Sequence, residues 1–363
     1  MKIAIDIQTT LGQPTGFGFY VSNLTRELKK ISAQSAGDLE FELIHPKSEI
    51  DFSTPRRFIW DQLTLPLIAI KKKADLLHQP CFSAPFIFKG PVVATIHDII
   101  SILFPENIPF ASRMFYSRWM PYSYRKADQI ITISESTKAD ITRVLKIPEE
   151  KITVIPLAYD ERFEKPISKS KIEAVKLKYK IANEYILHLG TLEPRKNLDF
   201  LIGVFARLIE NDGCKDLQLV ITGKKGWYYE GLFEKVRRLK LKSRVIFTGY
   251  VDDEDKPALY RAAKIFAFPS LYEGFGLPPL EAMASGVPVV SSNTSSLPEV
   301  VAEAGILLSP RNESEWVKAL ERINRDRELR SRMIEKSKSQ AKNFSWEKTA
   351  RKTIGVYRKA LNE

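Results

Sequence analysis

The chain of 363 residues has only two cysteines, Cys81 and Cys214, which are too few for a disulfide framework and lack metal-ligand spacing. It contains no run of about 18 uncharged apolar residues, so we expect no transmembrane helix. Residues 2–7 begin a strand pattern with an acid in it, unlike a signal peptide, so we expect a cytoplasmic protein. The composition is that of a globular chain long enough for about two domains.

Acidic residues are also fewer than basic ones, which gives a net charge of +12. Such a balance attracts anions, including nucleic acids, acidic membranes and phosphorylated substrates. The simpler alternative is a lysine-rich solvated surface, because the lysines are spread along the chain. Binding of nucleic acid would not explain the two carboxylates Glu273 and Glu281, which the next paragraph describes. We therefore expect no nucleic-acid partner.

The most informative stretch is residues 270–286, SLYEGFGLPPLEAMASG. An apolar strand pattern leads into a turn with Gly274 and Gly276, and two prolines then favour the first turn of a helix. Backbone amides at a helix N-terminus form an anion site. Because phosphate would repel Glu273 and Glu281, we expect both carboxylates to accept hydrogen bonds from hydroxyl groups. The alternative is an ordinary strand–turn–helix unit in which Glu281 compensates the helix dipole.

A second stretch, residues 190–197 (GTLEPRKN), follows another apolar strand pattern. Arg195 and Lys196 lie between that strand and a helix pattern. Arginine offers a bidentate fork and lysine a compact point charge, so the pair suits a diphosphate. A charged loop tip is the alternative interpretation.

The chain opens with a strand pattern, a polar loop over residues 8–18 that contains Gly16 and Gly18, and a helix pattern. This order is typical of a Rossmann-like unit, but the dinucleotide fingerprint is incomplete, so NAD binding is only weakly supported. His97 follows the strand pattern of residues 92–96, at the edge where open α/β sheets bind ligands. A structural histidine is the alternative.

Residues 110–126 (FASRMFYSRWMPYSYRK) are basic and aromatic and contain no acid. Such a helix is a candidate for contact with an anionic membrane, peripheral to the cytoplasm. Equally, its aromatic side chains could pack into the core while the arginines face water. We expect Pro121 to kink or break the helix.

Together with Val287-Pro288-Val289-Val290 and Leu297-Pro298-Glu299, the stretch 270–286 resembles the E-x7-E signature of the retaining glycosyltransferases of family 4. The chain looks most like bacterial or archaeal mannosyl- or rhamnosyltransferases of surface polysaccharide assembly. The resemblance implies the GT-B fold: two α/β, Rossmann-like, doubly wound parallel-sheet domains that face each other across a cleft. We expect an N-terminal acceptor-binding domain at 1–165, a nucleotide-sugar domain at 166–345, and a last helix at about 346–363 packing back on the first.

The resemblance also assigns roles to residues. The diphosphate would be bound by Arg195, Lys196 and the Gly16 amide, with Gly18 in the same loop. His97 would line the sugar, and Glu281 would bind the ribose. The sugar would be bound by Glu273 and its following turn, and the base by a later loop; these residues are Gly274, Phe275, Gly276 and Leu277 for the sugar and Gly249, Tyr250 and Val251 for the base. One departure is Thr191, where many members have an arginine.

The expected function is retaining transfer of a hexose, mannose from GDP-mannose, to a glycan or lipid-linked acceptor, with no metal or other cofactor. Asp253 and Asp255 form a D-x-D that holds a metal in other glycosyltransferases, but here it precedes a helix pattern and favours capping. The alternatives are a UDP-sugar-dependent transferase of the same fold and a nucleotide-sugar epimerase, and the base, sugar and acceptor stay open.

Overall fold

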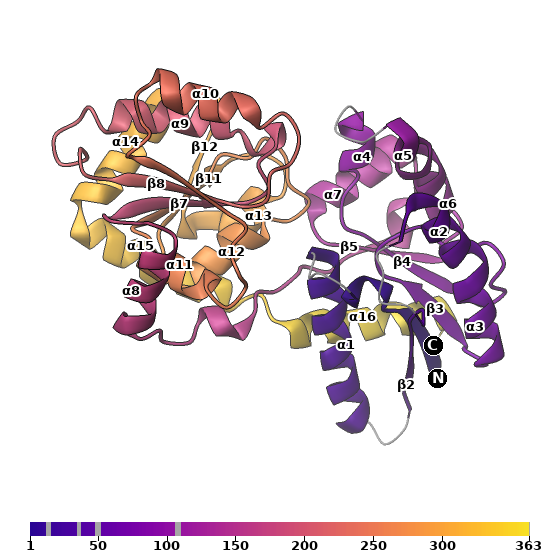
Figure 1. Ribbon diagram of the computed structural model, residues 1–363. Coiled ribbons are helices and arrows are strands. Elements are labelled where there is room, and N and C mark those ends of the chain that lie inside the picture. The colour runs from indigo at the N-terminus through magenta and orange to yellow at the C-terminus, as the bar shows by residue number, and fades with distance from the viewer. Residues whose placement is uncertain (12–15, 35–37, 48–51, 106–109, 363) are drawn as a thin grey trace. The chain divides into compact units, whose positions relative to one another are not determined.

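The computed structural model describes residues 1–11, 16–34, 38–47, 52–105 and 110–362. The chain divides into two compact units, Met1–Leu157 with Ser345–Glu363, and Ala158–Phe344 (Figure 1). The first boundary was expected at 165, but residues 158–165 belong to the second unit. Over the described ranges, every helix is too short or too polar to span a membrane.

The first unit is built on a six-stranded parallel sheet with the order β2-β1-β3-β4-β5-β6. Since β2 and β3 flank β1, the chain reverses direction across the sheet between β1 and β3, where open α/β sheets bind ligands. The strands of the middle of the sheet are buried on both faces, which explains their apolar sequences. The strands are β1 (Lys2–Asp6), β2 (Glu40–Ile44), β3 (Leu76–Gln79), β4 (Val92–Ile96), β5 (Gln129–Thr132) and β6 (Ile152–Val154).

The last helix, α16 (Trp346–Leu361), packs in the first unit against α1 (Gly16–Gln34) (Figure 1). Tyr357 on α16 forms a hydrogen bond of 2.7 Å with His78 Nδ1 on β3. The return of the C-terminus to the first unit is therefore confirmed. Gly16 and Gly18 lie in the first turn of α1, so their placement in a loop was wrong; residues 12–15 of that predicted loop lie outside the described residues.

Two helical segments of this unit pass through a proline by way of a π turn. The segment 54–71 consists of α2 (Thr54–Ile59), η2 (Trp60–Thr64) and α3 (Leu65–Lys71), and 110–124 consists of α5 (Phe110–Met114), η4 (Phe115–Trp119) and α6 (Met120–Tyr124). In the second, the Met120 N–H donates to the Phe115 carbonyl, five residues back. This shift accommodates Pro121, which has no N–H, so the predicted break does not occur.

The first unit has shorter helices as well. These are η1 (Gln8–Thr10), α4 (Ile100–Leu103), α7 (Glu135–Asp140), η5 (Ile141–Leu145) and η6 (Glu149–Lys151). Ser134 caps α7 by accepting a hydrogen bond from the Thr137 N–H, as its residue type favours.

The second unit has a parallel sheet with the order β12-β11-β10-β7-β8-β9. The chain runs outward from β7 to β9 and then returns to β10 on the other side of β7. Its reversal point thus lies between β7 and β10, and the loops that follow these two strands meet there. The strands are β7 (Tyr185–Leu189), β8 (Gln218–Thr222), β9 (Val245–Gly249), β10 (Ile265–Phe268), β11 (Val289–Ser292) and β12 (Ile306–Leu308).

Helices cover the sheet of the second unit, and α9 and α14 pack against each other over a core that includes Phe205 and Trp316. Two parallel α/β units are the predicted architecture, which is confirmed. The helices are η7 (Glu161–Phe163), α8 (Lys169–Lys178), η8 (Pro194–Lys196), α9 (Leu198–Leu208), α10 (Glu230–Arg238), α11 (Lys256–Ala262), α12 (Leu277–Ala284), α13 (Leu297–Val301), η9 (Ala302–Ala304), α14 (Glu313–Arg325) and α15 (Arg327–Ala341).

Candidate active site

The loops after β7 and β10 are fastened to each other at the reversal point of the second sheet. The Leu271 N–H donates to the Arg195 carbonyl at 2.9 Å. Asn197 adopts a left-handed backbone with a φ of 56°, which asparagine tolerates better than most residues. Its amide Nδ2 donates to the carbonyls of Pro269 and Pro310. These contacts fix the turn η8, which carries both predicted cations, against the loop that carries Glu273.

At this point Arg195 and Lys196 both form ion pairs with Glu273. Lys196 Nζ lies 2.5 Å from Glu273 Oε1, and Arg195 Nη1 lies 2.9 Å from Glu273 Oε2. Arg195 also binds Glu193 Oε1 and the Tyr272 carbonyl. The four side chains of Glu193, Arg195, Lys196 and Glu273 are each 9–12% exposed. The structure therefore brings the predicted cations and Glu273 together, but as a cluster with no net charge instead of as two cations open to an anion.

Burial and the neighbouring cations shift the pKa of Glu273 in opposite directions. Burial by itself raises this pKa, but the charges of Lys196 and Arg195 outweigh it and hold the pKa at about 2. Glu273 is thus ionised at neutral pH. Burial lowers the pKa of Lys196, against the opposing charge of Glu273. An ammonium has three donors, so Lys196 can bind a second acceptor beside the carboxylate.

The turn from Glu273 to Gly276 is locked by two serines of the next loop. Ser295 Oγ accepts from the Glu273 N–H at 2.8 Å, and Ser296 Oγ donates to the carbonyls of Glu273 and Phe275. Gly276 has a φ of 116°, and a Cβ there would lie 3.0 Å from Leu297 Cδ2. Glycine is therefore required at this position. The sequence did not indicate a role for either serine.

The prolines at positions 278 and 279 limit the donors at the start of α12. Since neither has an N–H, the N-terminal donors of this helix come from Gly276 and Leu277. These two amides follow Glu273 directly, so the site has a short row of donors beside a fixed carboxylate. The roles predicted for these residues in sugar and phosphate binding stay predictions.

Glu281 lies on α12 and is buried, at 9% exposure. The Tyr260 hydroxyl on α11 donates to Glu281 Oε2 at 2.9 Å. Burial raises the pKa of Glu281 to about 7, so its charge changes near neutral pH. Tyr260 was missed; a buried tyrosine usually has a hydrogen-bond partner for its hydroxyl, but the sequence does not say which.

The loops after β8 and β9 complete this edge of the sheet. Gly223 lies so close to the loop after β7 that a Cβ would be 2.0 Å from the Gly190 carbonyl oxygen. Gly249 ends β9 with a φ of 72°, Tyr250 is half-exposed beside the Lys224 ammonium, and Val251 is buried. The role predicted for residues 249–251 on a base stays a prediction.

In the first unit, His97 follows β4 and is buried. Its Nε2 donates to the Pro80 carbonyl at 2.9 Å, and its ring contacts those of Phe17 and Tyr20. Burial lowers the pKa of His97 to about 4, which keeps the ring neutral. It borders a cavity of about 140 Å³ that Phe82 and Asp98 also line. The roles predicted for His97, Gly16 and Gly18 toward the donor stay predictions.

The two acids of the D-x-D pair with lysines. Asp255 accepts from Lys171 at 2.6 Å and Lys178 at 2.7 Å, and Asp253 lies 2.5 Å from Lys256 Nζ. These partners hold the pKa of Asp255 at about 2 against the effect of burial. Asp255 occupies the N-cap position of α11, but its side chain makes no capping hydrogen bond. The capping interpretation was therefore wrong for the side chain of Asp255, whose partners Lys171 and Lys178 lie on α8.

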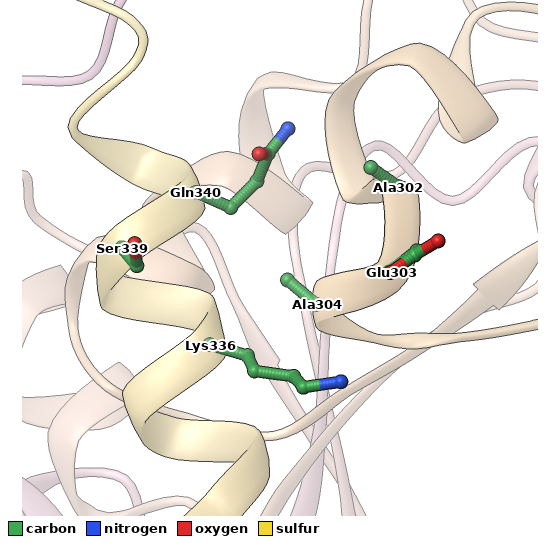
Figure 2. A pocket seen from close by; sticks show the side chains of 6 residues that line it. All are labelled: Ala302, Glu303, Ala304, Lys336, Ser339 and Gln340. Carbon is green, nitrogen blue, oxygen red and sulfur yellow. The ribbon is translucent and has the colours of Figure 1, made fainter.

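A shallow hollow elsewhere in the second unit lies between η9 and α15 (Figure 2). Alanines, Glu303, Lys336, Ser339 and Gln340 line it, and none of them belongs to the site described above. Glu303 and Lys336 lie on opposite sides of it (Figure 2). We assign it no role.

The fold agrees with solved glycosyltransferase structures. Anabaena Alr3699/HepE in complex with UDP-glucose aligns with a TM-score of 0.74 and 20% identity, over 99% of this chain and all of that one. Sucrose-phosphate synthase of Thermosynechococcus elongatus aligns with a TM-score of 0.75 and 20% identity, over 99% of each chain. The two-unit architecture is therefore that of a GT-B protein.

Sequence comparison identifies the family. The pattern described as Glycosyltransferase Family 4 matches residues 17–163, and that described as Glycosyl transferases group 1 matches residues 170–340. O-antigen chain mannosyltransferase B of Escherichia coli is 35% identical over 84% of this chain and 77% of that protein. The serotype-specific mannosyltransferase WbdA of E. coli is 32% identical to this chain. The alignment covers 74% of this chain and 33% of WbdA. The chain belongs to the family 4 glycosyltransferases and is an enzyme of that class.

Proposed function

We propose that the enzyme transfers mannose, with retention of anomeric configuration, from GDP-mannose to a glycan or lipid-linked acceptor without a divalent metal. The cluster of Lys196, Arg195 and Glu273 at the reversal point of the second sheet carries this proposal. The name of the relative that is 35% identical, a mannosyltransferase, supports mannose as the sugar. GDP is proposed as its usual carrier, with UDP as the alternative.

The mechanism follows from where charge develops. Breaking the anomeric C–O bond leaves negative charge on the diphosphate and positive character on the sugar. Lys196 has donors beyond the one that Glu273 uses, and the amides of Gly276 and Leu277 lie at the same loop. A preorganised donor aimed at developing charge typically lowers a barrier by about 2.7–4 kcal/mol. These groups would stabilise the leaving diphosphate.

Glu273 has a different role in this proposal. Its carboxylate is already ionised and has further lone pairs, so it can accept hydrogen bonds from sugar hydroxyls. Arg195, which binds Glu193 and the Tyr272 carbonyl as well, positions Glu273 more than it binds phosphate. The acceptor hydroxyl would attack on the face that the diphosphate leaves, and its proton would pass to the leaving phosphate oxygen.

A donor panel tests the proposal. Purified enzyme is incubated with GDP-mannose, UDP-glucose and UDP-N-acetylglucosamine, with and without a lipid-linked or oligosaccharide acceptor extract, in excess EDTA. Mannose transfer from GDP-mannose that needs the acceptor is the expected result. Conversion of a donor without acceptor would indicate an epimerase or hydrolase. Activity that EDTA abolishes and Mg²⁺ restores would contradict metal independence and direct attention to Asp253 and Asp255.

A further inference from the structure

The helical segment 54–71 is apolar on both of its faces. One face, with Trp60, Leu65 and Ala69, is buried in the core of the first unit. The other face carries four aliphatic side chains at spacings of four, four and three residues, which align on one side of a helix. Their exposed fractions are 46–56%, and they are Ile59, Leu63, Leu67 and Ile70. We call these four residues the aliphatic stripe.

Aromatic contacts extend the stripe onto the neighbouring segment 110–124. Phe58, 38% exposed, precedes the stripe, and its ring lies 5.1 Å from that of Trp119. Trp119 in turn contacts Tyr122, which is 54% exposed. Because Phe58 precedes Ile59 directly, these aromatics add exposed apolar surface beside the stripe. Contiguous apolar surfaces of this kind on soluble proteins mark sites of interaction.

The exposed charged residues of these two segments are all basic. Residues 54–73 and 110–126 together contain nine basic residues and one acid, Asp61. Asp61 is fully buried, 3.5 Å from Arg57, so it does not contribute an exposed negative charge. Lys71 and Lys73 are exposed at the end of the stripe, and Arg118 is exposed beside Trp119. Lys72, at the same end, pairs with Glu42.

We propose that the aliphatic stripe docks on a membrane surface of anionic phospholipid. Side chains such as Leu63 and Leu67 would enter the boundary between headgroups and acyl chains, while Lys71, Lys73 and Arg118 would pair with lipid phosphates. A second copy of the chain is a poorer occupant, because a two-fold interface would place like charges close to one another.

This surface differs from the one that the sequence indicated. Within residues 110–126, Phe115, Met120 and Tyr124 are buried in the core of the first unit. These three residues follow the core interpretation, and the segment contributes only its exposed edge to the membrane surface. The aliphatic stripe lies on a segment that sequence reasoning did not single out.

Co-sedimentation with lipid vesicles tests the proposal. The full chain is mixed with vesicles of phosphatidylcholine alone, or of equal parts phosphatidylcholine and phosphatidylglycerol. We expect binding to the anionic vesicles only, weakened by salt. In Leu63→Ser/Leu67→Ser, the partition coefficient should fall at least about tenfold, because two half-exposed leucines no longer enter the lipid. The matched control is Leu177→Ser/Leu239→Ser, which alters exposed leucines of the second unit.

Charge reversal gives a second readout. Lys71→Glu/Lys73→Glu should lose binding to anionic vesicles, while Lys318→Glu/Lys342→Glu, with the same change in net charge, should retain it. Thermal denaturation confirms that each variant is folded. Wild-type protein that binds neither vesicle would overturn the proposal. A dimer that Leu63→Ser/Leu67→Ser converts to a monomer would also overturn it and identify the stripe as a subunit interface.

Discussion

Lys196 Nζ lies 2.5 Å from Glu273 Oε1, although 77 residues separate the two along the chain. The contact forms because β7 and β10 are neighbours at the reversal point of their sheet, so the loops after them share one edge. It joins the two stretches that sequence reasoning selected separately. The enzyme thus holds Lys196, proposed to bind phosphate, and Glu273, proposed to bind the sugar, as one buried ion pair.

The ion pair of Lys196 and Glu273 should make the free energy of unfolding depend on pH in the acidic range. The pKa of Glu273 is about 2 when folded and 4.5 ordinarily, so its stabilising contribution is complete above about pH 4.5 and is lost as pH falls toward 2. At about 1.4 kcal/mol for each pKa unit, the total is about 3 kcal/mol. Chemical denaturation between pH 5 and 2 measures it.

Glu273→Gln should remove this part of the pH dependence. Because it leaves the buried Lys196 without its carboxylate while Arg195 keeps Glu193, it should cost about 3–5 kcal/mol at neutral pH. Glu328→Gln, at an exposed position, is the control and should leave the profile unchanged. An unchanged profile in Glu273→Gln would mean that the ion pair does not hold the pKa down.

Glu281 should make nucleotide binding depend on pH in the neutral range. Its pKa is about 7, and we expect the ionised form to accept the ribose hydroxyls. Affinity for GDP should therefore be constant above pH 7 and fall about tenfold for each pH unit below it. Calorimetric titration between pH 5.5 and 8.5 checks this.

The comparison with 2′,3′-dideoxy-GDP isolates the ribose contact. Wild-type enzyme should prefer GDP at pH 8, and Glu281→Gln should lose both the pH dependence and most of that preference. A preference that survives in Glu281→Gln would assign the ribose to another residue.

Gly276 should tolerate no side chain. The turn would hold an alanine at this position at a φ of 116°, and the Cβ of that alanine would lie 3.0 Å from Leu297 Cδ2. Gly276→Ala should lower the free energy of unfolding by about 1–3 kcal/mol. Gly231→Ala, on α10 with nothing within 4 Å of the added Cβ, should be neutral or stabilising. Equal effects of the two substitutions would show that the turn before α12 is not strained.

The sequence predicted most of the sheet and the turn before α12, because these depend on local patterns. The strand at 92–96 has the predicted bounds, and the apolar run expected before residue 190 forms β7, since short apolar runs between turn residues are typical of buried parallel strands. The E-x7-E stretch was recognised for the same reason. Its two carboxylates lie where the strand, turn and helix predict.

Pairings between distant residues could not be predicted. The sequence does not indicate that Glu273 forms ion pairs with Arg195 and Lys196. Nor does it indicate that Lys171 and Lys178 form ion pairs with Asp255, because the topology of the sheet decides these contacts. The segment 54–71 was missed for a different reason. It is apolar on both faces, so its sequence does not distinguish the exposed stripe from the buried face, and a π turn is needed to accommodate Pro66.

The most direct test of the account is the kinetics of Lys196→Met with GDP-mannose and a competent acceptor. This change keeps the length and apolar stem of the side chain and removes only the ammonium. If Lys196 stabilises the departing diphosphate, kcat should fall about 10²–10³-fold, while Lys242→Met, at an exposed position, stays at the wild-type rate. A rise in KM with kcat unchanged, in a protein that is folded, would mean that Lys196 only binds substrate or supports Glu273, and would contradict the proposed role of this cluster in the transfer step.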